Sequence, residues 1–141
     1  MWIPRSIILL LALSVVGCAG SDTYQPSVGK QVALGSSQQM TLPATQYQRV
    51  YVLAQPGQTL HVSVESISGT SPISLTLYPT VAAKGGFVAP ASNFVPKPFQ
   101  RTGLLPLTSD IALPTTWNPK DALVVEVKNI GSTGLEVNLR L

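Results

Sequence analysis

Apolar and polar residues alternate along several short stretches of this chain, and that period of two constrains its fold more than any other feature. In the stretch TLHVSVES, residues 59–66, Leu60, Val62 and Val64 fall on one side and polar residues on the other. Such a period places successive side chains on opposite faces of a β-strand. Several such strands, separated by glycine and proline turns, predict an all-β chain that folds as a single antiparallel β-sandwich over residues 31–141. The same alternation occurs at residues 73–79, 123–128 and 135–141.

The turns predict how these strands pair. Pro56-Gly57 is a type II turn signal, because proline presets φ at one central position and glycine supplies the positive φ at the next. It ends an expected strand over residues 47–53. The short turns at residues 68–72 and 129–134 each predict a hairpin between the two strands that they connect. Weaker strand candidates lie at residues 32–34, 40–42 and 111–113.

Residues 1–17 resemble a bacterial lipoprotein signal peptide. Arg5 supplies a positive charge ahead of an apolar run that is shorter than the about 20 residues of a membrane-spanning helix, so we expect a cleaved signal helix. Val15-Val16-Gly17-Cys18 is similar to the lipobox, which implies cleavage between Gly17 and Cys18 and a covalent diacylglyceryl and N-acyl lipid on Cys18. The alternative is that Cys18 is an inert cysteine at the end of an ordinary signal peptide. It cannot form an internal disulfide, because the chain has no second cysteine.

Residues 18–30 would then form the lipidated N-terminus and a flexible tether. Ala19 stands where an aspartate would resemble an inner-membrane retention signal, so the resemblance implies the outer membrane. Acyl chains gain about 0.8 kcal/mol per buried CH₂ group, and several chains on one residue hold a domain firmly at a bilayer. We therefore expect a lipid-anchored domain that faces the periplasm or the cell surface.

Between residues 81 and 106 the alternation stops and four prolines interrupt the chain, which predicts a long loop. All three phenylalanines and three basic residues lie there, and no acidic residue occurs between Glu65 and Asp110. Aromatic and arginine side chains are common anchors of protein interfaces, so this loop is a candidate binding surface for an apolar or anionic partner. The alternative is that the phenylalanines complete the core. Trp117, outside the loop, either stacks on a sugar ring or fills the end of the sandwich. The candidate partner-binding residues are therefore Lys84, Phe87, Phe94, Lys97, Phe99, Arg101 and Trp117.

RVYVLAQPGQTLHVSVESISGTSPISLTLYP, followed by DALVVEVKNIGSTGLEVNLRL, resembles the bacterial pre-peptidase C-terminal domain. The shared frame is a strand, a Gly-Gln turn, an alternating strand, a Ser-Gly turn, a strand ending in Leu-Tyr and two closing strands. The resemblance implies a jelly-roll-like sandwich that serves as a binding or processing module. Thr70, Ser71 and Pro72 stand where that family commonly has acidic residues, so neither calcium nor any other metal or cofactor is expected.

The residues offer little chemistry for an enzyme. A Ser-His-acid triad would need His61, the only histidine, which falls on the polar face of its predicted strand. Glu126 and Glu136 could face each other across the last hairpin, but Lys128 and Arg140 would neutralise them there. We find no phosphate-binding loop, metal-ligand cluster or nucleophile elbow, and the net charge of +3 is too small for a nucleic-acid partner.

These features predict a membrane-anchored, non-catalytic accessory lipoprotein that binds another cell-envelope component, such as a subunit of a protein complex. The alternative is a glycan-binding module for peptidoglycan or lipopolysaccharide sugars, which would include anionic glycans. A small hydrolase acting through His61 is a third possibility.

Overall fold

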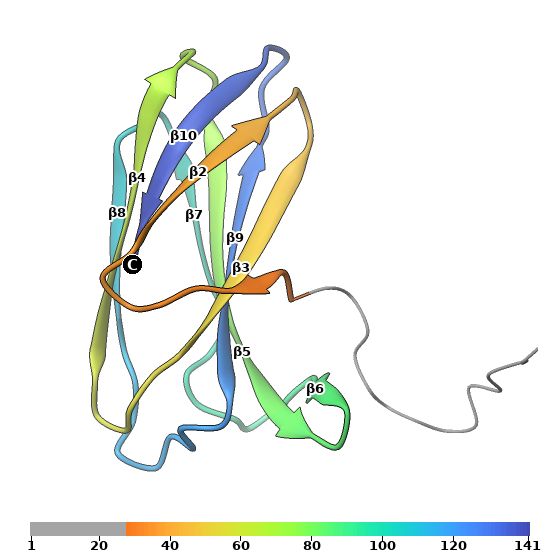
Figure 1. Cartoon of the computed structure of the whole chain (residues 1–141), viewed down its shortest axis with the longest axis vertical. Coiled ribbons are helices and arrows are strands. Elements are labelled where there is room, and N and C mark those ends of the chain that lie inside the picture. Colours follow the sequence, from red (N-terminus) through yellow and green to blue (C-terminus); the bar gives the residue numbers. More distant parts are fainter. Residues whose placement is uncertain (1–27) are drawn as a thin grey trace, which may run out of the picture.

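A computed structural model describes residues 28–141 and shows, within that range, an all-β sandwich without helices (Figure 1). The predicted all-β sandwich is therefore confirmed. The signal peptide, the Gly17–Cys18 cleavage site and all but the end of the predicted tether lie outside the described residues. The strands are β1 (Lys30–Gln31), β2 (Ser37–Leu42), β3 (Tyr47–Leu53), β4 (Thr59–Ser68), β5 (Ile73–Ala83), β6 (Gly86–Val88), β7 (Phe99–Gly103), β8 (Leu107–Ala112), β9 (Ala122–Asn129) and β10 (Leu135–Arg140).

Two sheets face each other across the core. One has six strands in the order β1-β3-β9-β5-β6, with β7 also paired to β5, and the other has four in the order β2-β10-β4-β8. All pairs are antiparallel except β1 with β3, which is parallel. The period-two pattern is explained by this arrangement, because each alternating strand turns its apolar face toward the facing sheet. Leu42, Val52, Val62, Val64, Ile73, Leu75, Leu77, Val125, Val127, Val137 and Leu139 are fully buried there.

Both predicted hairpins are wrong. β4 and β5 belong to different sheets, and so do β9 and β10. At each turn the chain crosses from one sheet to the other, and this buries the apolar faces of successive strands against each other. A hairpin would have left both strands in one sheet, with their apolar side chains on the same face of that sheet and still exposed to water. The antiparallel neighbours of β9 are instead β3 and β5, and those of β10 are β2 and β4.

The long loop predicted for residues 81–106 is also corrected. β5 runs on to Ala83, β6 forms a short hairpin with its end, and β7 pairs with its first half. β6 and β7 show no period of two because neither buries one face: residues 99–102 of β7 are all exposed, and all three residues of β6 are half-buried. Of the weaker strand candidates, residues 40–42 lie in β2 and residues 111–112 in β8, whereas residues 32–34 follow β1 without forming a strand.

Asn129, at the end of β9, is a fully buried polar residue that ties the two sheets together. Its side-chain nitrogen donates to the carbonyl oxygens of Leu42 (2.9 Å) and Thr133 (2.7 Å). Its side-chain oxygen accepts from the Ser71 hydroxyl (2.6 Å) and from the backbone N–H of Gly131 (3.0 Å). One amide therefore fixes the end of β2, the turn before β5 and the connection between β9 and β10.

Candidate functional site

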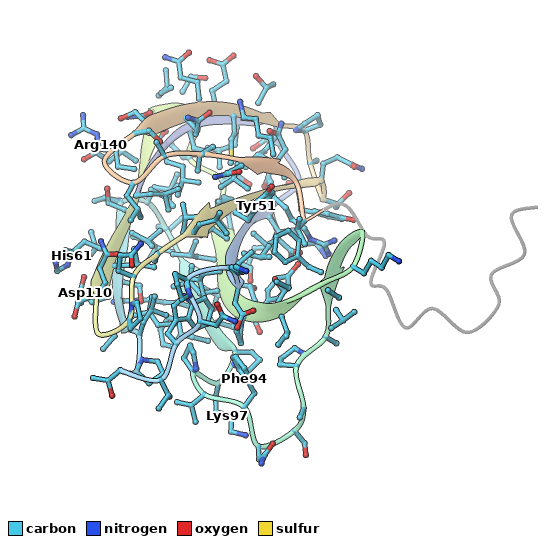
Figure 2. The ribbon with its side chains drawn as sticks, turned by 60° about the horizontal axis from the view of Figure 1, so that its bottom comes forward. Tyr51, His61, Phe94, Lys97, Asp110 and Arg140 are labelled. Atoms are coloured by element: carbon cyan, nitrogen blue, oxygen red, sulfur yellow. The ribbon has the colours of Figure 1, made fainter. Side chains whose placement is uncertain are left out.

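The seven residues predicted as one recognition surface lie in three different places. Trp117 is 3% exposed and packs edge-to-face on Phe94, with the ring centroids 6.2 Å apart. Phe94 in turn is half-buried against the core and closes the lower end of the sandwich in Figure 2. Burial removes Trp117 from the candidate surface and gives Phe94 a core-closing role. Lys97 is exposed nearby, and its ammonium group donates to the carbonyl oxygen of Ser92 within the same loop.

Phe87 lies instead on the outer face of the six-stranded sheet. β5 runs beyond the end of β9, and its hairpin with β6 lies against β3, where Phe87 packs edge-to-face on Tyr51 at a centroid distance of 5.3 Å. The buried Asp121 holds this hairpin by accepting a hydrogen bond from the backbone N–H of Ala82 (2.8 Å). Lys84 is exposed at the hairpin turn.

The third group lies on β7, an edge strand of the six-stranded sheet. In the described residues β7 pairs with β5 alone, so its other edge carries no strand. Phe99 is 40% exposed, and exposed Val95 and Leu104 lie on either side of the strand in sequence. Arg101 reaches across to β8, where its guanidinium donates to the carbonyl oxygen of Thr108 (2.8 Å). We call Val95, Phe99, Arg101 and Leu104 the β7 surface.

Sequence reasoning missed Val95 and Leu104. An apolar residue in an irregular stretch gives no sign of whether it points into the core or into solvent, because the stretch has no periodicity. The exposure of these two residues follows from the position of β7 at the sheet edge, and that position depends on a pairing with β5 that the sequence did not reveal.

A second group of aromatic side chains lies on the outer face of β3 and on β6, with an arginine among them. We call Tyr47, Arg49 and Tyr51 of β3, together with Phe87 of β6, the aromatic face. Arg49 Nε is 2.6 Å from Glu126 Oε2 on β9, and both side chains are less than a fifth exposed. The Arg49 guanidinium also lies 4.6 Å from the centroid of the Tyr47 ring. Burial lowers the pKa of Arg49, but the hydrogen bond to Glu126 and the attraction of Tyr78, Glu126 and Tyr47 outweigh it, so the pKa is raised above its usual value.

The outer face of the four-stranded sheet is polar and carries a groove of about 520 Å³. Gln58, His61, Ser63, Asp110 and Arg140 are among its lining residues. His61 on β4 and Asp110 on β8 are cross-strand neighbours, with Nδ1 and Oδ1 2.6 Å apart (Figure 2). Leu34, Leu60, Val62 and Leu141 also line the groove, so it offers both hydrogen-bonding and apolar contacts, which suits a sugar ring.

The His61–Asp110 pair has the histidine–carboxylate contact of a catalytic triad, but not the enclosed position and the hydroxyl nucleophile that a triad needs. The two side chains are 76% and 66% exposed, and among residues 28–141 no hydroxyl group is hydrogen-bonded to His61. A triad histidine is held between acid and nucleophile, so this pair is a solvated cross-strand contact.

Glu126 and Glu136 do not face each other, because β9 and β10 lie in different sheets. Glu126 is paired with Arg49, and Glu136 is near Ser68, whose hydroxyl lies 3.4 Å from Oε2. In the described part of the chain, histidine and acidic residues form no group of three that could hold a metal ion. Residues 28–141 also contain no helix that could cross a bilayer.

The two facing antiparallel sheets define a small β-sandwich that is also found among solved structures. The pre-peptidase C-terminal domain of collagenase from Bacillus anthracis has a similar structure, with a TM-score of 0.51. The alignment covers 83% of this chain and 97% of that domain, at 10% sequence identity, so it shows a shared fold and nothing more. No protein-family model and no curated protein matches the chain.

Proposed function

We propose that this chain is a non-catalytic accessory lipoprotein of the cell envelope. In this proposal Cys18 carries the lipid that holds the sandwich at the outer membrane, and the β7 surface binds another envelope protein. The lipobox-like stretch ending at Cys18 supports the anchor. The accessory role is proposed by analogy with the collagenase domain, which has the same fold.

The observation that carries the proposal is the exposed edge at β7. An edge strand presents backbone N–H and C=O groups to which an extended segment of another protein can add as a further strand. Phe99 and Leu104 provide apolar side chains beside that edge, and Arg101 provides a cation. Aromatic, aliphatic and arginine side chains grouped in this way are typical of the few residues that dominate binding at protein interfaces.

Photo-crosslinking in intact cells tests this proposal. A photoreactive amino acid at Phe99 or Leu104 should give a discrete protein adduct, and the same probe at Thr41, exposed on β2 of the other sheet, should not. Arg101→Glu should weaken binding by about ten-fold or more, whereas Lys120→Glu, which makes the same charge change elsewhere, should leave it intact. Equal adducts at all three probe positions, or none, would refute the β7 surface, and absence of palmitate on Cys18 would refute the anchor.

A glycan-binding role is the second candidate, and the groove on the four-stranded sheet favours it. Its amide, hydroxyl, carboxylate and guanidinium groups are those that hydrogen-bond to sugar hydroxyls and acidic sugars. The protein should then sediment with purified peptidoglycan sacculi, and Arg140→Ala should reduce the sedimented fraction while Arg101→Glu does not. A protein that stays in the supernatant with sacculi would rule out peptidoglycan as the ligand.

A further inference from the structure

We propose that the aromatic face and the β5–β6 hairpin rest on the anionic phospholipid surface of the membrane. The sandwich would then be held in one orientation, with the four-stranded sheet turned away from the bilayer. This inference rests on the proposed lipid anchor and goes beyond it, because it assigns the surface that meets the lipid and the charge that the lipid carries.

The described chain begins at the edge of the six-stranded sheet, beside β3. β1 lies along β3, with Lys30 opposite Val50 and Gln31 opposite Tyr51. Gly29 has a φ of +82° and approaches the Arg49 carbonyl oxygen so closely that a Cβ would lie 1.8 Å from it. The start of the described chain is therefore fixed against β3. Only ten residues separate Cys18 from Gly29, and even a fully extended chain of that length spans at most about 35 Å.

Aromatic and basic side chains lie near that edge. Tyr51 is the register partner of Gln31 and the packing partner of Phe87, so β1, β3 and the β5–β6 hairpin meet at one place. Figures 1 and 2 both show the hairpin on the side of the sandwich where the described chain begins. Tyr47 is 50% exposed, and Lys84 is exposed at the hairpin turn. Tyrosine rings are enriched at the membrane–water interface, where the ring contacts the acyl boundary and the hydroxyl contacts water.

The two sheets differ in the charges that they expose. Exposed Glu65, Asp110 and Glu136 all lie on strands of the four-stranded sheet, where exposed Arg140 offsets one of these three negative charges. The acidic residue beside the aromatic face, Glu126, is already paired with Arg49. On the strands of the six-stranded sheet and the hairpin, exposed Lys30, Lys84 and Lys128 have no ion pair within residues 28–141. An anionic surface therefore attracts the six-stranded side and repels the other, at about 1 kcal/mol for each lysine near the lipid.

Depth-dependent fluorescence quenching tests the orientation. The acylated full-length lipoprotein would be placed in vesicles of phosphatidylethanolamine and phosphatidylglycerol that contain a nitroxide-labelled lipid. An environment-sensitive dye would be attached in separate proteins through Lys84→Cys and, as the matched control on the opposite sheet, through Glu65→Cys. Acylation occupies the thiol of Cys18, so the introduced thiol is the one that reacts.

We expect strong quenching of the dye at position 84 and little at position 65. Quenching at position 84 should fall in vesicles of phosphatidylcholine alone, and also at about 1 M salt, where the Debye length shrinks to about 3 Å. Equal quenching at both positions, or none at either, would overturn the orientation. Palmitate labelling of the same protein reports the anchor separately, so a failure of the proposed anchor can be told apart from a failure of the orientation.

Discussion

Replacing Asn129 by alanine should cost this fold a large part of its stability. The substitution removes an amide that makes four hydrogen bonds between the end of β9 and three other segments. It leaves the partners of that amide in place, and two of them, the Leu42 carbonyl and the Ser71 hydroxyl, belong to buried residues. A buried polar group that loses its partner costs more than an average hydrogen bond contributes, because it cannot turn to water.

The size of the effect follows from the burial of each partner. An unsatisfied buried donor or acceptor costs about 1–3 kcal/mol, which applies to Leu42 and Ser71. The bonds to Thr133 and Gly131 are only partly buried, so water can replace the amide there at about 0.5 kcal/mol each. The sum is about 3–7 kcal/mol, against the about 5–15 kcal/mol that stabilises a typical domain. Asn129→Ala should therefore be marginally folded at 25 °C.

Urea-induced unfolding measures this change, with the fluorescence of the buried Trp117 as the signal. The free energy of unfolding in water comes from linear extrapolation. The matched control is Asn138→Ala on β10, where the same residue type is only half-buried and makes no side-chain hydrogen bond among residues 28–141. That control should shift stability by less than about 1 kcal/mol. A loss of under 1 kcal/mol for Asn129→Ala, or one equal to that of the control, would show that the amide does not join the sheets as described.

A double-mutant cycle on Arg49 and Glu126, measured by chemical denaturation, should give a coupling free energy of about 1–3 kcal/mol. The reason is that the two side chains are in contact and each is less than a fifth exposed. A coupling free energy near zero would contradict that geometry. Trp117→Ala should lower the free energy of unfolding by about 3–5 kcal/mol, because it leaves a cavity at the end of the core. An unchanged melting temperature would show that the Trp117 side chain is not buried. His61→Ala should change stability by less than about 0.5 kcal/mol and leave envelope function intact, and loss of function in a folded His61→Ala protein would reopen the hydrolase hypothesis.

The strands that alternate could be predicted from sequence because each buries one face and leaves the other in water. Val62 and Val64 on β4, and Val137 and Leu139 on β10, have the alternation that a half-buried strand requires. The partners of these strands could not be predicted in the same way. A turn such as residues 68–72 joins two strands equally well within one sheet or across two, and only packing against the rest of the chain decides between them.

The candidate site was harder to predict, since exposure depends on tertiary structure. The position of Phe87 on the aromatic face depends on the extension of β5 beyond β9 and on the buried carboxylate of Asp121, neither of which has a sequence signature. Phe94 and Phe99 are only five residues apart, yet one closes the core and the other is exposed at a sheet edge. The lack of acidic residues between Glu65 and Asp110 was visible in the sequence, but only the fold shows that exposed Glu65, Asp110 and Glu136 share the four-stranded sheet.

The positions of β9 and β10 have a consequence for the timing of folding. These are the last two strands of the described chain, and each lies inside its sheet: β9 between β3 and β5, and β10 between β2 and β4. Without residues 122–140, each sheet separates into two pieces that share no hydrogen bonds. A chain that is threaded N-terminus first through a narrow pore therefore stays unfolded until nearly all of it has passed. The order of strands along the chain thus delays the completion of both sheets until residues 122–140 are available.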